Sequence, residues 1–181
     1  MRARQLSFAA LKSSSKTEDL SRRTRHGHEI RKGRRKLFRP IDPRKPLHLV
    51  FRSERARGIW SLRRFKHVEH IRMLTYFLAK KNDVKVIQYA NAGTHLHLLV
   101  LAKDRNLFKR FTRTLTGLVA RLVTGAKKGN AVGKFWDPLF FSRVVEWGRD
   151  YFATKAYVIQ NELEAIGPIP YSPRKKPRLR P

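Results

Sequence analysis

The feature that most restricts the fold of this chain is an ordered change in the spacing of its apolar residues between positions 47 and 166. Apolar side chains alternate or form short unbroken runs at 47–52, 84–89, 95–101 and 139–147, which indicates strands. They recur every three or four residues at 68–81, 104–124 and 150–166, which indicates amphipathic helices. The resulting order, β-α-β-β-α-β-α, predicts an α+β protein. We expect a ferredoxin-like antiparallel sheet with a βαββαβ core plus a C-terminal helix.

Basic segments flank this region on both sides. Residues 1–46 contain serine and arginine runs followed by Pro40, Pro43 and Pro46, so we expect a basic flexible arm there. Residues 172–181 form a second basic tail, and residues 47–171 make up the predicted domain. For both tails, general attraction to phosphate explains the composition as well as any specific role does.

The charge of the whole chain points to a polyanionic partner. Lysine and arginine number 42 against 13 acidic residues, a formal net charge of +29. Nucleic acid is the first candidate partner and an anionic membrane surface is the second. No apolar run approaches the roughly 18 residues of a membrane span, so we expect no membrane partner. The chain has no cysteine, which excludes thiolate sites. We expect a cytoplasmic, nucleoid-associated protein.

His95 and His97 stand one residue apart in an apolar strand segment. Residues i and i+2 of a strand point to the same face, so both imidazoles project together and can share one divalent ion. A pair of hydrogen-bonded histidines on a sheet face is the alternative, and the pattern is too short to decide. The other histidines, His48 among them, add nothing to the metal prediction, because none repeats this strand-and-turn context.

The last predicted helix carries a tyrosine away from its apolar stripe. Phe152, Ile159, Leu163 and Ile166 fall on one side, which we expect to face the core. Tyr157 falls on the polar side with Asn161 and Glu164. A phenol placed beside a metal can attack phosphorus, and Asn161 could supply an oxygen to the same metal. A surface tyrosine hydrated by water is the alternative interpretation.

Several basic and aromatic residues are candidates for binding nucleic acid. The helix predicted at 104–124 is apolar along Leu107, Phe111 and Leu115 and basic on its other side. The candidate contacts to phosphate are Lys109, Arg110, Arg113, Lys127, Lys128 and Arg143. Trp136 is a candidate for stacking on a base, although a large aromatic residue beside Phe135 also suits a protein core.

Taken together, these residues resemble the HUH family of single-tyrosine transposases. His95-Leu-His97 resembles its His-hydrophobic-His motif, and Tyr157-Val-Ile-Gln-Asn161 is similar to the Tyr-x-x-x-Asn stretch of the REP-associated branch. The resemblance covers roughly residues 46–168. Thr94 stands where relatives often have Asn, and Glu162 where they commonly have Pro, so the geometry of the metal site can differ.

The resemblance implies a metal-dependent DNA endonuclease and strand transferase. His95, His97 and Asn161 would bind Mg²⁺ or Mn²⁺, and Tyr157 would form a 5′-phosphotyrosine link. The implied substrate is single-stranded DNA with a hairpin. Two alternatives stay open: a non-catalytic hairpin-binding protein derived from a transposase, and a basic structural protein of a ribonucleoprotein particle. The sequence also leaves open a homodimer.

Overall fold

The computed structural model describes residues 25–26, 39–130 and 132–172. After the short strand β1 (Arg25–His26), the chain forms β2 (Leu47–Arg52), the 3₁₀ turn η2 (Gly58–Trp60) and helix α2 (Phe65–Lys81). A hairpin of β3 (Val84–Asn91) and β4 (His95–Ala102) follows, and then α3 (Arg105–Thr124), β5 (Phe141–Val144) and α4 (Arg149–Ile166). The predicted order of elements and the α+β class are confirmed.

The strands form one antiparallel sheet in the order β1-β5-β2-β4-β3. Without β1, the order β5-β2-β4-β3 is that of a ferredoxin-like sheet, in which the first and third strands of the βαββαβ motif lie at the centre. β4 therefore lies between β2 and β3, and both of its edges are paired. The histidine-bearing strand is thus held at the middle of the sheet.

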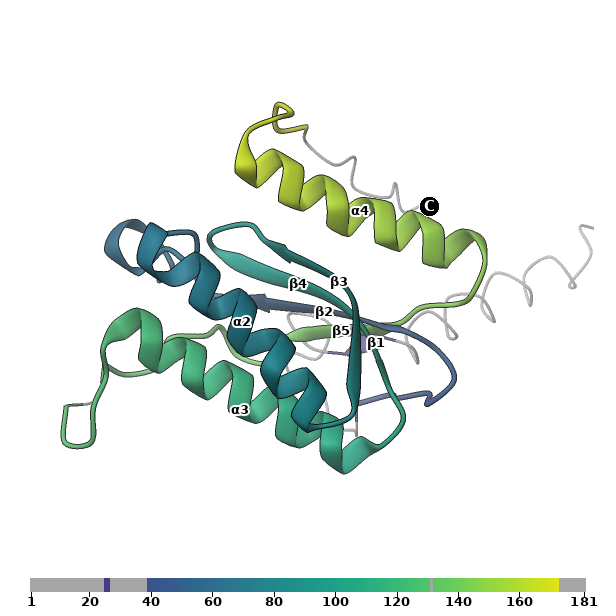
Figure 1. The fold of residues 1–181 in the computed structure, drawn as a ribbon, viewed down its shortest axis with the longest axis horizontal. Coiled ribbons are helices and arrows are strands. Elements are labelled where there is room, and N and C mark those ends of the chain that lie inside the picture. Colours follow the sequence, from purple (N-terminus) through teal and green to yellow (C-terminus); the bar gives the residue numbers. More distant parts are fainter. Residues whose placement is uncertain (1–24, 27–38, 131, 173–181) are drawn as a thin grey trace, which may run out of the picture.

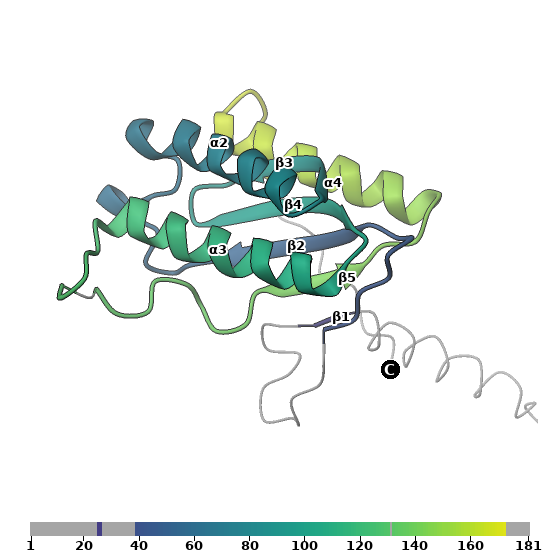
Figure 2. The ribbon, with the colours of Figure 1, turned by 60° about the horizontal axis from the view of Figure 1, so that its bottom comes forward.

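The two faces of the sheet differ in chemistry. Residues on β2 and β4 alternate between faces, so Leu49 and Leu98 point to one side while Val50 and His97 point to the other. Helices α2 and α3 cover the first side, and α4 lies across the second (Figure 1 and Figure 2). The apolar core is between the sheet and α2 and α3. The face under α4 carries the histidines.

Helix α3 begins and ends at residues suited to those positions. The Asp104 side chain accepts a hydrogen bond from the Leu107 amide, 2.7 Å away, and Gly125 ends the helix in a left-handed conformation. Its buried stripe contains Phe111 and Leu115, as predicted. Phe108 and Val119 are also buried in that stripe, whereas Leu107 is only partly buried. Within the described ranges, none of the helices has the length and apolar character that spanning a bilayer requires.

Helix α4 faces the sheet with a different side from the one predicted. Thr154, Val158 and Asn161 are buried, whereas Phe152 is 68 % exposed and Ile166 is 57 % exposed. The prediction assumed that the more apolar stripe must pack inward. It was wrong because α4 packs on the polar, histidine-bearing face of the sheet, where small and polar side chains find partners. The apolar stripe of α4 is left on the outside.

Part of the segment assigned to the basic arm packs against the domain. The Arg39 guanidinium stacks over the Phe140 ring at 3.6 Å and donates to the Phe140 carbonyl. Strand β1 pairs with β5, which places Arg25 opposite Arg143. The rest of the predicted arm, 1–24 and 27–38, and the tail from 173 onward lie outside the described residues.

Candidate functional site

A cleft of about 720 Å³ opens between α4 and the histidine-bearing face of the sheet. We call it the histidine cleft. It is walled by β2, β4 and β5, by the segment 137–140 and by α4. Its lining residues are His48, Val50, Arg52, His95, His97, Asp137, Pro138, Leu139, Phe140, Phe141, Arg143, Asp150, Ala153, Thr154 and Tyr157. The two predicted metal ligands and the predicted nucleophile therefore line one cavity.

The Nδ1 atoms of His95 and His97 both lie within hydrogen-bonding distance of a neighbour. Nδ1 of His95 is 2.9 Å from the Thr94 hydroxyl, and Nδ1 of His97 is 3.3 Å from Nε2 of His48. When one ring nitrogen donates its proton to such a partner, the other nitrogen has the lone pair that a metal needs. The two ring centroids are 4.7 Å apart. This chemistry suits binding of a divalent ion through both Nε2 atoms.

His48 belongs to the site, contrary to the sequence analysis. It lies on β2 next to β4, and its ring stacks on that of His97 with an interplanar angle of 11°. Burial, followed by the positive charge of Arg143, lowers the pKa of His48 to about 4. His48 is therefore neutral at pH 7 and can accept a proton shared with His97 Nδ1. This role is not visible in the local sequence, because strand register brings the two histidines together.

Tyr157 lies over the histidines from the opposite wall of the cleft. Its ring centroid is 5.5 Å from that of His97 and 5.8 Å from that of His48, nearly perpendicular in both cases. The side chain is 36 % exposed, so its ring is open to solvent on one side. One turn later, the Asn161 Nδ2 donates to the Tyr157 carbonyl at 2.6 Å. Asn161 is buried, and it is not among the residues that line the histidine cleft.

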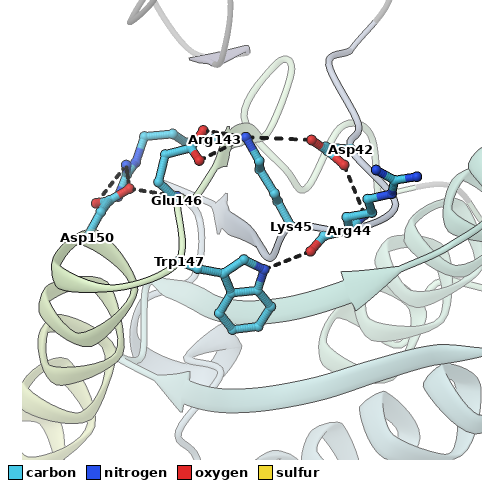
Figure 3. A network of polar contacts seen from close by, with 7 residues as sticks. All are labelled: Asp42, Arg44, Lys45, Arg143, Glu146, Trp147 and Asp150. Carbon is cyan, nitrogen blue, oxygen red and sulfur yellow. Dashed lines mark hydrogen bonds and ion pairs between the residues drawn. The ribbon is translucent and has the colours of Figure 1, made fainter.

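The position of α4 over the cleft is fixed by polar contacts at its start. Arg143 on β5 donates to both carboxylate oxygens of Asp150, at 3.0 and 2.7 Å, and to the Thr154 hydroxyl at 2.7 Å. Hydrogen bonds from Arg143 lower the pKa of Asp150, although its partial burial acts in the opposite direction. The contacts of Arg143 join the sheet directly to α4 (Figure 3).

Two more contacts hold the connection between β5 and α4. Lys45 pairs with Glu146 at 2.8 Å, and the Trp147 indole donates to the Arg44 carbonyl at 2.8 Å (Figure 3). The segment preceding β2 thus fastens the turn that leads into α4. Tyr157 is presented to the histidines of its own chain by a helix tied to the same sheet.

The predicted contacts to nucleic acid lie in several different places. Arg143 lines the histidine cleft, and Lys109 and Arg113 line a separate hollow beside α3. Lys127 and Lys128 line a third hollow with Arg121 and Lys134. Arg110 donates to the side chain of buried Asn82 at 2.7 Å, which ties α3 to the end of α2.

Trp136 has the packing role that the sequence analysis left open. Its ring contacts Phe51 and Phe135, and its indole nitrogen donates to the Thr116 carbonyl at 2.8 Å. It is partly buried against the apolar core. These contacts connect the segment before β5 to α3 and so support the wall of the cleft.

Arg52 is a further residue of the cleft that the sequence analysis did not single out. It lies directly opposite His95 in the sheet register, so both side chains point to the same face. Asp137 lies 3.6 Å from the Arg52 guanidinium and is part of the same lining. Across 25–26, 39–130 and 132–172, no group of three or more His, Cys, Asp or Glu side chains could hold a metal.

Two solved structures of transposases are similar to this chain, and the first of them shares its fold. One is a REP-associated tyrosine transposase bound to a REP hairpin, with 11 % sequence identity, a TM-score of 0.54, and coverage of 75 % of this chain and 76 % of that one. Another is a candidate transposase from Deinococcus radiodurans R1, with 18 % identity, a TM-score of 0.44, and coverage of 71 % and 98 %. No family model and no curated protein matches the sequence. The chain therefore has a transposase-like fold.

Proposed function

We propose that this protein is a metal-dependent endonuclease and strand transferase that acts on single-stranded DNA bearing a hairpin. The observation that carries the proposal is the convergence of Tyr157, His95 and His97 on one cleft within one chain. The fold shared with a tyrosine transposase bound to a hairpin supports it. The basic charge of the chain supports the choice of DNA as substrate.

In the proposed reaction the Tyr157 oxygen attacks the phosphorus of one phosphodiester. A bond forms between this oxygen and phosphorus, the bond from phosphorus to the 3′ oxygen breaks, and a 5′-phosphotyrosine and a free 3′-OH result. The phenolic proton leaves to solvent through the open side of the cleft, and the 3′ oxygen takes up a proton. Attack by a free 3′-OH on the phosphotyrosine reverses these changes and rejoins the strand.

The protein would hold Mg²⁺ or Mn²⁺ through His95, His97 and the amide oxygen of Asn161. When bound, the ion would polarise the scissile phosphate and stabilise the charge that develops on its oxygens. His48 keeps the His97 ring in place and accepts its Nδ1 proton. Arg52, which lies opposite His95, supplies a positive charge on the same wall of the cleft.

The proposal is tested by capturing the covalent intermediate. Purified protein is incubated with Mn²⁺ and hairpin DNA that carries a randomised single-stranded extension, and adducts are separated on a denaturing gel. We expect an adduct with the natural protein and none with Tyr157→Phe. Tyr151→Phe is the matched control, because Tyr151 lies on the same helix and contacts Trp147 instead of the histidines. It should form the adduct normally.

The two histidines are tested in the same assay. His95→Ala and His97→Ala should lose the adduct while keeping most of their affinity for DNA, because phosphate contacts elsewhere supply that affinity. Binding of Mn²⁺ measured by calorimetry should weaken in both variants. Tight hairpin binding with no adduct under any metal would instead support the non-catalytic binding protein.

A further inference from the structure

A second hollow lies on the other side of the segment that closes the histidine cleft. Leu139 and Phe140 line both cavities, so this segment separates them. The second hollow has a volume of about 460 Å³ and lies between α3 and residues 39–41 and 139–140. We call it the α3 groove. A strand that occupied both cavities would cross Leu139 and Phe140, the two residues that the cavities share.

The lining of the α3 groove is basic. Arg39, Arg105, Lys109 and Arg113 contribute to it, and none of its lining residues within the described ranges is acidic. Arg39 and Arg105 are part of the wall, because Arg39 stacks on Phe140 and Arg105 donates to the Arg39 carbonyl at 2.8 Å. Lys109 and Arg113 are exposed and lie one helical turn apart on α3. This arrangement suits two successive negative charges along a flexible strand.

Leu139 has an unusual conformation at the boundary between the two cavities. Its φ is 54°, in the left-handed region that leucine seldom adopts, and its side chain is 54 % exposed. Its neighbour Phe140 packs on Phe51 with ring centroids 4.6 Å apart and holds the segment in place. An exposed apolar side chain at this point offers a surface for an unstacked base.

We infer that the α3 groove binds the phosphate backbone of the DNA strand whose scissile phosphate lies in the histidine cleft, with Leu139 beneath the strand where it crosses. The inference rests on the proposed function for the position of the scissile phosphate. The groove makes the binding site longer than the cleft, so affinity should depend on the length of the strand. Lys109 and Arg113 contribute phosphate contacts to long strands only.

The inference is tested by measuring how salt affects binding of two single-stranded oligonucleotides, of about 4 and about 12 nucleotides, both within the usual range of single-strand site sizes. Binding to the full chain is measured by fluorescence anisotropy. Divalent metal is left out of the buffer so that the DNA is not cleaved. In Lys109→Ala/Arg113→Ala, the slope of log affinity against log salt should fall by about 1.4 for the long strand, since each lost contact to a single strand removes about 0.7. The slope for the short strand should not change.

The matched control removes two charges from a helix that does not line either cavity. Lys66→Ala/Lys81→Ala, on α2, should leave both slopes close to those of the natural protein.

Leu139→Ala should weaken binding of the long strand severalfold and leave both salt slopes unchanged. Equal slope changes in the two double variants, or equal losses on short and long strands, would overturn the inference. Thermal unfolding of each variant confirms that it is folded.

The adduct assay separates failure of this inference from failure of the proposed function. If the natural protein forms the adduct in Mn²⁺ but Lys109→Ala/Arg113→Ala binds the long strand as the natural protein does, only the inference is overturned. A length-dependent loss in that variant, with no adduct from the natural protein, would support the groove and overturn the nuclease. Lys66→Ala/Lys81→Ala should form the adduct at the natural rate, because neither side chain lines the histidine cleft or the α3 groove.

Discussion

At the scale of single residues, burial of His48 gives the protein a defined dependence on pH. The imidazole is 6 % exposed, and burial followed by the charge of Arg143 lowers its pKa to about 4, while the charge of Asp150 acts in the other direction. The unfolded chain, with a pKa near 6.5, therefore binds more protons than the folded chain between pH 4 and 6.5. Stability should fall as pH decreases through this window, by on the order of 3 kcal/mol.

The measurement is the free energy of unfolding from urea titrations between pH 4 and 7. His48→Gln retains an acceptor near the position of Nε2 but does not titrate, so its profile should be flatter than that of the natural protein in this window. Protonation of Asp150, whose pKa is also lowered, destabilises both proteins alike as the pH falls. Parallel profiles for the two proteins would show that His48 does not titrate in this way.

At the scale of elements, the orientation of α4 sets which substitutions matter. Val158 is fully buried against the sheet, so Val158→Ala should destabilise the protein by on the order of 2 kcal/mol. Phe152 is mostly exposed on the same helix, and Phe152→Ala should change stability by less than about 0.5 kcal/mol. Thermal or chemical unfolding of both variants measures the difference. A larger loss from Phe152→Ala would mean that α4 faces the sheet with its apolar stripe after all.

The elements themselves could be predicted because their signals are local. Helix α3 runs from Arg105 to Thr124, within one residue of its predicted start, because Asp104 and Gly125 are strong signals for the ends of a helix. Strand alternation alone predicts that His95 and His97 project from the same face of the sheet. The common factor is that each of these predictions needs only residues that are close in sequence.

The orientation of α4 and the role of His48 could not be predicted, because both depend on contacts between distant segments. Periodicity finds the more apolar side of a helix, but it does not show that the sheet beneath is polar. Likewise, the place of His48 beside His97 depends on the antiparallel register in which Val50 faces His97. Each error arose where tertiary packing overrode a local preference.

At the scale of the whole molecule, one chain brings Tyr157, His95 and His97 to the same cleft. Arg143 ties α4 to β5 through Asp150 and Thr154, and Lys45 and Trp147 fasten the preceding turn. Together these contacts place Tyr157 over His97 of the same chain. If the protein forms a homodimer, each subunit should therefore react by itself.

This arrangement predicts the result of mixing two inactive proteins. Tyr157→Phe lacks the nucleophile and His97→Ala lacks a metal ligand, so each should form no adduct alone. Because α4 is tied to its own sheet, neither protein can lend its intact group to the other, and a mixture should stay inactive in the denaturing-gel assay at any protein concentration. An adduct that appears only in the mixture would mean that α4 detaches and places Tyr157 in a partner's cleft. The contacts of Arg143 would then hold a resting state, and Arg143→Ala should increase the adduct formed by the mixture.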